Sequence, residues 1–314
     1  MSYEWPLLIF TFLAEVAVGA FIGGGCAKAL GLAAEAAPEP RTADNGPGEK
    51  SAPAGKSPLF AAFFGGCTGV LALGLLSSML HLGSLLGAPL ALGNLGASWL
   101  SREILTGVLT LVGMAVTAAL AWKVSDAAAT IAWVITVVVS FVFLVCAGSA
   151  YQMATIPYWN TLATPLGLII GALVAGGAVT AAFALVAKAG CIDRAFPFAA
   201  AGAVAFGLFG FTTALGFGEA SMGGTAGVAS VALAAGQQMP LLAGQMLCGA
   251  AGVALQLASV RPWQAPTAAA GTADAAGSQQ GNRKALAVAG AVLILIALFM
   301  ARMLFYSAAV NMQY

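Results

Sequence analysis

The residues of this chain that could carry out proton chemistry are few. The only histidine is His81, and Arg102 and Glu103 follow it after a short interval. Imidazole and carboxylate groups accept and relay protons near neutral pH, so this set suits a reaction that removes protons from a substrate hydroxyl. Glu15 is a further candidate, because it lies deep in an apolar segment, where an ionisable side chain is costly and marks a functional site by default.

The same residue types exclude several redox centres. One histidine cannot provide the two histidine ligands of a b-type haem, and the five cysteines form no C-x-x-C or C-x-x-C-H motif. This excludes covalent haem attachment and an iron–sulfur cluster held by this chain alone. We expect no haem, no iron–sulfur cluster and no other metal in the chain. If it handles electrons, the carrier is a diffusible quinol from the membrane, which releases electrons and protons when it is oxidised.

The composition places the chain in a membrane. Of its 314 residues 61% are hydrophobic and 7% are charged, whereas about 25% of the residues of a soluble domain are charged. A sequence this apolar cannot cover itself with polar surface, so a soluble globular enzyme is excluded. The net charge of +1, without clusters of lysine and arginine, argues against a nucleic-acid partner.

The apolar segments predict an all-α, polytopic membrane protein, with a single integral membrane domain over residues 1–314. A helix needs about 20 apolar residues to cross the hydrocarbon core. The bundle of eight transmembrane helices is expected at Trp5–Gly25, Leu59–Leu80, Ile104–Trp122, Ala127–Ala150, Leu162–Ala187, Ala195–Leu215, Met239–Val260 and Ala285–Tyr306. The apolar stretch Thr225–Gly236 is too short to cross, and we expect a short helix there, at the membrane interface or packed on the bundle.

The basic residues predict the orientation. Ten of the 12 lysines and arginines fall in the connections after the first, third, fifth and seventh spans, and only Arg102 and Arg302 fall on the opposite side. Lysine and arginine near span ends stay on the cytoplasmic side, so we expect both termini outside and a multi-pass location in the inner (cytoplasmic) membrane. Residues 31–58 and 261–284 are rich in Ala, Pro, Gly and polar residues and are expected to be flexible cytoplasmic loops.

His81, Arg102 and Glu103 should be neighbours on the outer side, because consecutive spans joined by a short connection usually pack side by side. Structural roles compete with the chemical ones. His81 and Arg102 suit the membrane interface. Glu103 in a first helical turn is favourable to the helix dipole, with Ser98 or Ser101 as the cap.

Two further groups have competing roles. Glu15 can be protonated and paired with a neighbouring hydroxyl, and the aromatic residues near the outer span ends are expected to form the aromatic belt of a membrane protein. These aromatic residues are Trp99, Tyr151, Tyr158 and Trp159. The residues alone therefore indicate a polytopic protein with an outward-facing ionisable cluster.

Three segments of the chain resemble a known family. Residues 4–11 (EWPLLIFT), 78–84 (SMLHLGS) and 96–104 (GASWLSREI) are similar to segments of the membrane anchor subunit of dimethyl sulfoxide reductase, DmsC, and its close paralogues. Eight spans with outward termini agree with that family along the whole chain. The two polar-rich loops depart from the family pattern without touching the candidate site.

The resemblance implies an anchor subunit that binds and oxidises menaquinol near the outer membrane face. It passes the electrons to an iron–sulfur subunit with four clusters, and a molybdopterin catalytic subunit on the same face reduces the terminal acceptor, an S-oxide, an N-oxide or another compound. His81, Arg102 and Glu103 take the catalytic positions by this resemblance. The quinol contacts expected with them are His81, Glu15, Ser84, Trp99, Arg102 and Glu103.

Two other functions stay open at this point. The NrfD or polysulfide reductase type of anchor also has eight spans and serves quinol chemistry, although the HLGS and SWLSREI segments favour DmsC. A secondary transporter would place its substrate and coupling-ion groups near the bilayer midplane on interrupted helices. Only Glu15 is placed for that role.

Overall fold

The computed structural model of the protein describes residues 5–32, 58–81, 92–187, 192–222, 224–261 and 273–310. For residues 32, 81, 92, 192–193, 224–237, 273–277 and 308–310 it describes the backbone alone. The helices are α1 (Trp5–Ala27), α2 (Pro58–His81), α4 (Trp99–Lys123), α5 (Asp126–Ala150), α6 (Ala163–Ala187), α7 (Ile192–Ser221), α8 (Gly224–Ser259) and α9 (Ala273–Val310), with the short π-helical segment η1 (Lys28–Leu32) and the 3-10 turn η4 (Leu92–Asn94).

Within these ranges, eight helices are long and apolar enough to cross a membrane. This finding confirms the predicted all-α class and the predicted number of spans. Each predicted span lies inside one of the helices or extends one residue beyond it. Segment length and composition were sufficient for this prediction, because a membrane-crossing helix satisfies all its backbone groups within itself.

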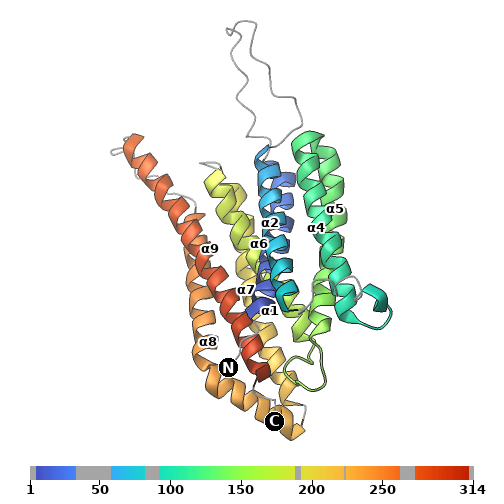
Figure 1. Ribbon diagram of the computed structural model, residues 1–314. Helices are drawn as coiled ribbons and strands as arrows, with labels where there is room; N and C mark the ends of the chain where they lie inside the picture. The colour runs from blue at the N-terminus through green and yellow to red at the C-terminus, as the bar shows by residue number, and fades with distance from the viewer. Residues whose placement is uncertain are drawn as a thin grey trace, which may run out of the picture.

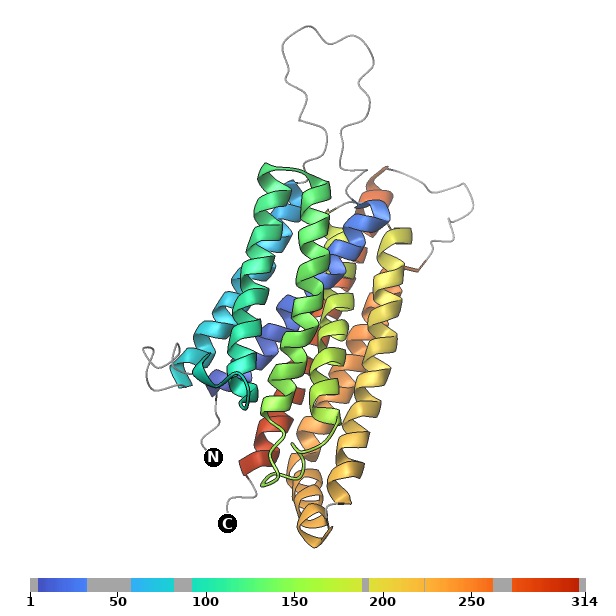
Figure 2. The ribbon, with the colours of Figure 1, turned by 90° about the vertical axis from the view of Figure 1, so that its right-hand side faces the viewer.

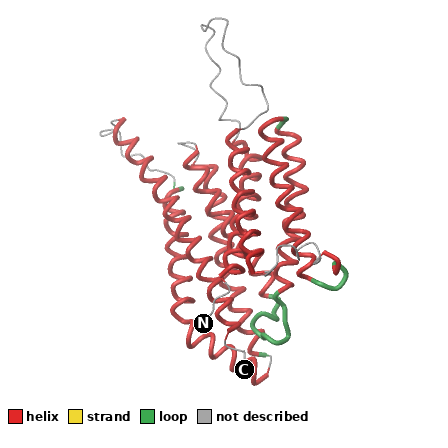
Figure 3. The backbone as a smooth tube through the Cα atoms, in the orientation of Figure 1, coloured by secondary structure: helices red, strands yellow, loops and turns green. Residues whose placement is uncertain are grey.

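The helices run side by side along one axis. In Figure 1, α2, α4 and α5 lie on one side, α8 and α9 on the other, and α1, α6 and α7 between them. Figure 2 shows that α1 begins and α9 ends at the same end of the bundle, which we call the lower end; the opposite end is the upper end. The longer described loops, before α4 and between α5 and α6, lie at the lower end (Figure 3).

Helices α1 and α6 form the centre of the bundle. They are the two most buried spans, and glycines let their backbones approach closely. A Cβ atom on Gly19 would collide with the carbonyl of Ala172, and one on Gly176 would collide with the backbone of Gly19. Small residues at helix interfaces allow this packing in a membrane, where dispersion contacts between helices replace the hydrophobic effect.

Two segments differ from the prediction. Residues 225–236 are not a separate short helix; they form the first part of α8, which contains Pro240 and crosses the lower end before it turns upward (Figure 1). Such turns are typical of a proline inside a helix, since it removes a backbone donor. Residues 273–284 are helical instead of a loop, because α9 begins at Ala273 in an alanine-containing stretch that favours helix. The predicted loop residues 33–57 and 262–272 lie outside the described residues.

Most basic residues of the described ranges lie at the upper end, whereas Arg102 and Arg302 lie in the lower half. Lys28 on η1 pairs with Asp126 at the start of α5 at 2.7 Å, and Arg194 of α7 donates a hydrogen bond to the carbonyl of Gly31. Gly31 has a φ of +83°, which favours glycine. The outward orientation of the termini stays a prediction from this one-sided distribution.

The close approach of α1 and α6 generates a prediction about packing. The change Gly176→Val should lower the melting temperature of the purified protein by roughly 2–12 °C, because its Cβ has backbone in its way and overpacking costs about 1–3 kcal/mol. The matched control is Gly69→Val on α2, which has nothing within 4 Å of the added Cβ and should shift the melting temperature by about 2 °C or less. Equal shifts in the two variants would show that the α1–α6 contact is not tight.

Candidate functional site

The start of α4 fixes Arg102 above a tight turn. The side chain of Ser98 caps the helix by accepting a hydrogen bond from the Ser101 amide at 3.3 Å. Arg102 donates to the carbonyls of Leu95 and Gly96 at 2.9 and 2.7 Å, and its guanidinium lies 4.5 Å from the centre of the Trp99 ring. Arg102 therefore holds the turn that precedes α4. The exposed Trp99 ring is fixed beside it.

Glu103 is a buried acid with no side-chain partner in the part of the chain that the structure describes. Its side chain is 6% exposed, and among the described residues its carboxylate makes no ion pair or hydrogen bond. The alternative that Glu103 serves the helix dipole is wrong, since the first turn of α4 contains no acidic residue. A buried carboxylate without a cation is costly and is suited to holding a proton.

His81 is the last residue of α2, which packs against α4. Its side chain lies outside the described residues, as does the whole of Ser84. Because α2 ends and α4 begins at the lower end (Figure 1), the backbone places His81 at the same end as Arg102 and Glu103. The contact of the imidazole with either side chain stays a prediction.

Glu15 is paired with arginine and not with a hydroxyl group as the sequence suggested. It is fully buried on α1, and Arg302 on α9 is 5% exposed. Arg302 Nε donates to Glu15 Oε2 at 3.0 Å, and Nη2 donates to Oε1. This is a bidentate pair, which is the stronger arrangement of arginine with a carboxylate. Gly171 of α6 faces the carboxylate, and a Cβ there would collide with it.

Two buried tyrosines, Tyr151 at the end of α5 and Tyr306 on α9, are hydrogen-bonded to each other. The hydroxyl oxygens of Tyr151 and Tyr306 are 2.7 Å apart, and Tyr306 is also within hydrogen-bond distance of the Leu7 carbonyl, at 3.2 Å. Burial raises the pKa of Tyr151 well above its ordinary value, and Tyr306 and the charge of Glu103 raise it further. The Tyr151 hydroxyl therefore keeps its proton.

The aromatic residues of the loop between α5 and α6 pack into the bundle. Trp159 stacks on Phe305 with the ring centres 5.0 Å apart and donates from Nε1 to the Phe305 carbonyl at 2.9 Å. Tyr151, Tyr158 and Trp159 are all buried, so the expectation of an aromatic belt is wrong for these three. Trp99 is 44% exposed, as we expect for a residue of an aromatic belt.

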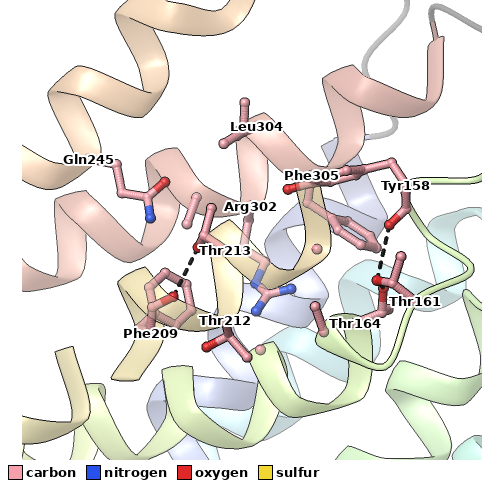
Figure 4. Close-up of a pocket in the computed structure, with 14 residues that line it drawn as sticks. Tyr158, Thr161, Thr164, Phe209, Thr212, Thr213, Gln245, Arg302, Leu304 and Phe305 are labelled. Carbon is pink, nitrogen blue, oxygen red and sulfur yellow. Dashed lines mark hydrogen bonds between the residues drawn. The ribbon is translucent and has the colours of Figure 1, made fainter. Parts of the chain in front are cut away.

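Arg302 also borders a pocket between α6, α7, α8 and α9 (Figure 4). Thr164, Thr212, Thr213 and Gln245 contribute its polar groups. Gln245 is fully buried, and neither its amide nitrogen nor its amide oxygen has a partner among the described residues. Buried amides of this kind are usually satisfied by ordered water, so we expect this side of Arg302 to be hydrated.

Three functional candidates escaped the sequence reasoning: Arg302, Tyr151 and Tyr306. Arg302 was counted only as a basic residue of the outer side, although it lies inside the predicted span 285–306. A charged side chain within a span is itself a signal for a buried partner. The two tyrosines gave no comparable signal, because aromatic residues are common near span ends.

The described residues contain no group of three or more His, Cys, Asp or Glu side chains that could hold a metal ion. The candidate site consists of ionisable and hydrogen-bonding groups on α1, α4, α9 and the α5–α6 loop.

Comparison with known proteins places this site in context. Residues 59–216 match the family model described as DMSO reductase anchor subunit (DmsC). The matched range contains His81, Trp99 and Glu103, whereas Glu15 and Arg302 lie outside it. No solved structure matches the sequence.

The similar proteins include three bacterial ones. The C subunit of anaerobic dimethyl sulfoxide reductase from Escherichia coli (strain K12) is 30% identical over 178 residues, 55% of each protein. YnfH of the same organism, also named as a chain of anaerobic dimethyl sulfoxide reductase, is 28% identical over 188 residues, 59% of each protein. The C subunit of the Haemophilus influenzae enzyme is 26% identical over 185 residues, 58% of each protein. The alignments thus cover little more than half the length of these relatives.

The ion pair generates a prediction about stability. The single changes Arg302→Met and Glu15→Gln should each lower the free energy of unfolding by about 3–5 kcal/mol, because each leaves a buried polar group without its partner. The double variant should regain most of the loss. Unfolding of the four proteins in detergent measures the coupling. Losses that simply add in the double variant would contradict the pair. Arg102→Met, which breaks hydrogen bonds to two backbone carbonyls and the contact with the Trp99 ring but no ion pair, serves as the control.

Proposed function

This chain belongs to the DMSO reductase anchor subunit (DmsC) family, and from that membership we propose that it anchors a DMSO reductase-type molybdoenzyme complex in the cytoplasmic membrane and oxidises menaquinol. Each quinol loses two electrons and two protons and becomes the quinone. The electrons pass to the iron–sulfur subunit of the complex, and the protons pass to side chains of this protein. The molybdopterin subunit reduces the terminal acceptor.

The observation that carries this proposal is the buried, unpaired carboxylate of Glu103 within the family-matched range. A quinol hydroxyl needs a proton acceptor within hydrogen-bond reach. Glu103 meets this need because no cation among the described residues neutralises it, and a neutral imidazole at His81 meets it for the second hydroxyl. Trp99, Arg102 and Ser84 complete the proposed quinol contacts.

Glu15 takes a different place in the proposal. Its carboxylate is held by Arg302, so it is less available than Glu103 as the first acceptor. It stays a proposed member of the quinol site. The family match also favours this function over an NrfD-type anchor and over a transporter.

The lower end of the bundle is the proposed outer face. It carries few basic residues, as the outer side of a membrane protein does, and it holds Glu103. The iron–sulfur and molybdopterin subunits would dock there, so that electrons need not cross the membrane. The supporting facts are the distribution of charge and the names of the relatives, which are components of dimethyl sulfoxide reductases.

The first functional prediction separates quinol oxidation from assembly. The changes His81→Ala and Glu103→Gln should abolish turnover of the assembled complex with a quinol donor, because the proton acceptors are lost. A soluble artificial donor should still drive the catalytic subunit at the normal rate. The control is Glu219→Gln at the same end, whose side chain only accepts a hydrogen bond from the Leu162 amide. If both donors fail equally in the His81 and Glu103 variants, these residues act in assembly.

The second functional prediction concerns charge movement. In the proposed reaction the protons are released at the outer face, the electrons leave toward that face, and the reduction of the acceptor consumes protons there. No net charge then crosses the membrane. The complex reconstituted in sealed vesicles should therefore turn over without generating a membrane potential, as read with a voltage-sensitive dye. A potential that builds up with turnover would contradict the outer location of the site.

A further inference from the structure

Helices α8 and α9 pack closely in opposite directions. Helix α8 runs toward the upper end, and α9 runs back toward the lower end (Figure 1). A Cβ atom on Gly290 of α9 would collide with the Gly252 carbonyl and the Gln256 side chain of α8, and a Cβ on Gly252 would collide with the Gly290 carbonyl. Gly290 therefore lies level with the stretch of α8 between Gly252 and Gln256.

This register brings three basic residues together at the upper end. Arg261 follows the end of α8, five residues after Gln256, and Arg283 and Lys284 lie on α9, seven and six residues before Gly290. Since a helix rises 1.5 Å per residue, the three residues lie within about 3 Å of one another in height. Packed helix axes are about 8–10 Å apart, a separation that the long side chains of arginine and lysine can bridge.

The acidic side chains that the structure describes lie elsewhere. Three of the four belong to the lower half of the bundle, and Asp126 at the upper end is paired with Lys28 at 2.7 Å. Asp274, of which the backbone is described, is nine residues from Arg283 on α9, about 13 Å along the axis. The three cations thus have no acid beside them among the described side chains, whose acids are Glu15, Glu103, Asp126 and Glu219.

Arg283 has an unused hydrogen-bond donor. Its Nη1 atom is buried and has no hydrogen-bond partner in the described part of the chain. A donor that leaves water without gaining an acceptor is costly, and more so when it carries charge. The planar guanidinium offers paired N–H donors that match the oxygens of a phosphate group. Arg283 is therefore suited to an anionic ligand with several oxygens.

An apolar surface continues from the basic cluster along α9. Val288, Val292 and Ile296 follow Lys284 at four-residue intervals, so that each lies close to the next on the helix. Their exposed fractions are 44%, 49% and 43%. They belong to the part of α9 that is long and apolar enough to cross a membrane. A ligand with an anionic group at the cations and an acyl chain along these side chains would match both features.

We propose that Arg261, Arg283 and Lys284 bind the phosphate group of an anionic membrane lipid, whose acyl chains lie on the exposed side of α9. Free phosphate has the same anionic chemistry but no apolar part for this side. The site lies at the opposite end of the bundle from Glu103, so the proposal goes beyond the quinol chemistry and does not depend on it. The cytoplasmic leaflet, where the upper end is proposed to lie, carries anionic lipids.

The experiment measures the binding of three probes to the full chain in detergent. Phosphatidylglycerol is an anionic lipid, phosphatidylcholine carries a phosphate but no net charge, and inorganic phosphate has no acyl chain. Phosphatidylglycerol should bind about tenfold to hundredfold more tightly than phosphatidylcholine, and an equal concentration of inorganic phosphate should not displace it. Arg261→Gln and Arg283→Gln should each weaken phosphatidylglycerol binding by about fivefold, and the double variant by about 25-fold.

The matched control is Lys123→Gln. Lys123 is an exposed basic residue at the upper end of α4, so this change removes the same charge outside the cluster and should leave the affinity for phosphatidylglycerol unchanged. Melting temperatures without lipid show whether each variant is folded. Arg261 is exposed, so Arg261→Gln tests the site even if the Arg283 variant does not fold.

Four results would overturn the lipid site: equal affinity for the two lipids, displacement of phosphatidylglycerol by inorganic phosphate, unchanged affinity in Arg261→Gln, or an equal loss in Lys123→Gln. Displacement by phosphate would assign the cluster to a soluble anion. An equal loss in the control would show that the surface charge of the upper end acts as a whole. None of these results concerns turnover with quinol, so the proposed function stands or fails separately.

Discussion

The arrangement depends on one buried ion pair, between Glu15 of α1 and Arg302 of α9. Removing two charges from water is costly, and the cost is offset only if the geometry is good and the remaining polar atoms are satisfied. The bidentate contact meets the first condition. The polar pocket on the other side of Arg302 contributes to the second. The pair thereby fixes the first and last helices of the bundle against each other, and Gly171 leaves the room that the carboxylate needs.

The positions of the other buried polar groups in the lower half follow from this pairing of α1 with α9. Once Glu15 and Arg302 are paired, helical spacing brings Thr11 and Tyr306 into contact one turn away. Tyr306 is then placed to hydrogen-bond with Tyr151. Trp159 stacks on Phe305, and this contact holds the α5–α6 loop against the helix ends. These aromatic side chains exclude water from the hydroxyls, which strengthens their hydrogen bonds in a low dielectric. A structural ion pair thus sets where these hydroxyls lie.

The sequence was informative where the signal is local and uninformative where it is long-range. Span positions follow from runs of apolar residues, and Glu103 and His81 stood out as ionisable groups near span ends. The partner of Glu15 lies 287 residues away, and no pattern along the sequence connects the two. Tyr151, Tyr158 and Trp159 were assigned to the lipid interface by the usual preference of aromatic residues. The hydrogen bonds of Tyr151 and Trp159 to residues of α9 and the ring contacts of Tyr158 with Phe217 and Phe305 override that preference.

The division of polar groups along the bundle has a functional consequence. At the upper end Lys28 is paired with Asp126 at the start of α5. The lower half instead holds two enclosed acids in unlike states, one balanced by arginine and one without a cation among the described side chains. Acids in unlike environments differ in their readiness to hold a proton. In the proposed function, this difference would let the protein separate the protons of a quinol from its electrons at one end of the membrane.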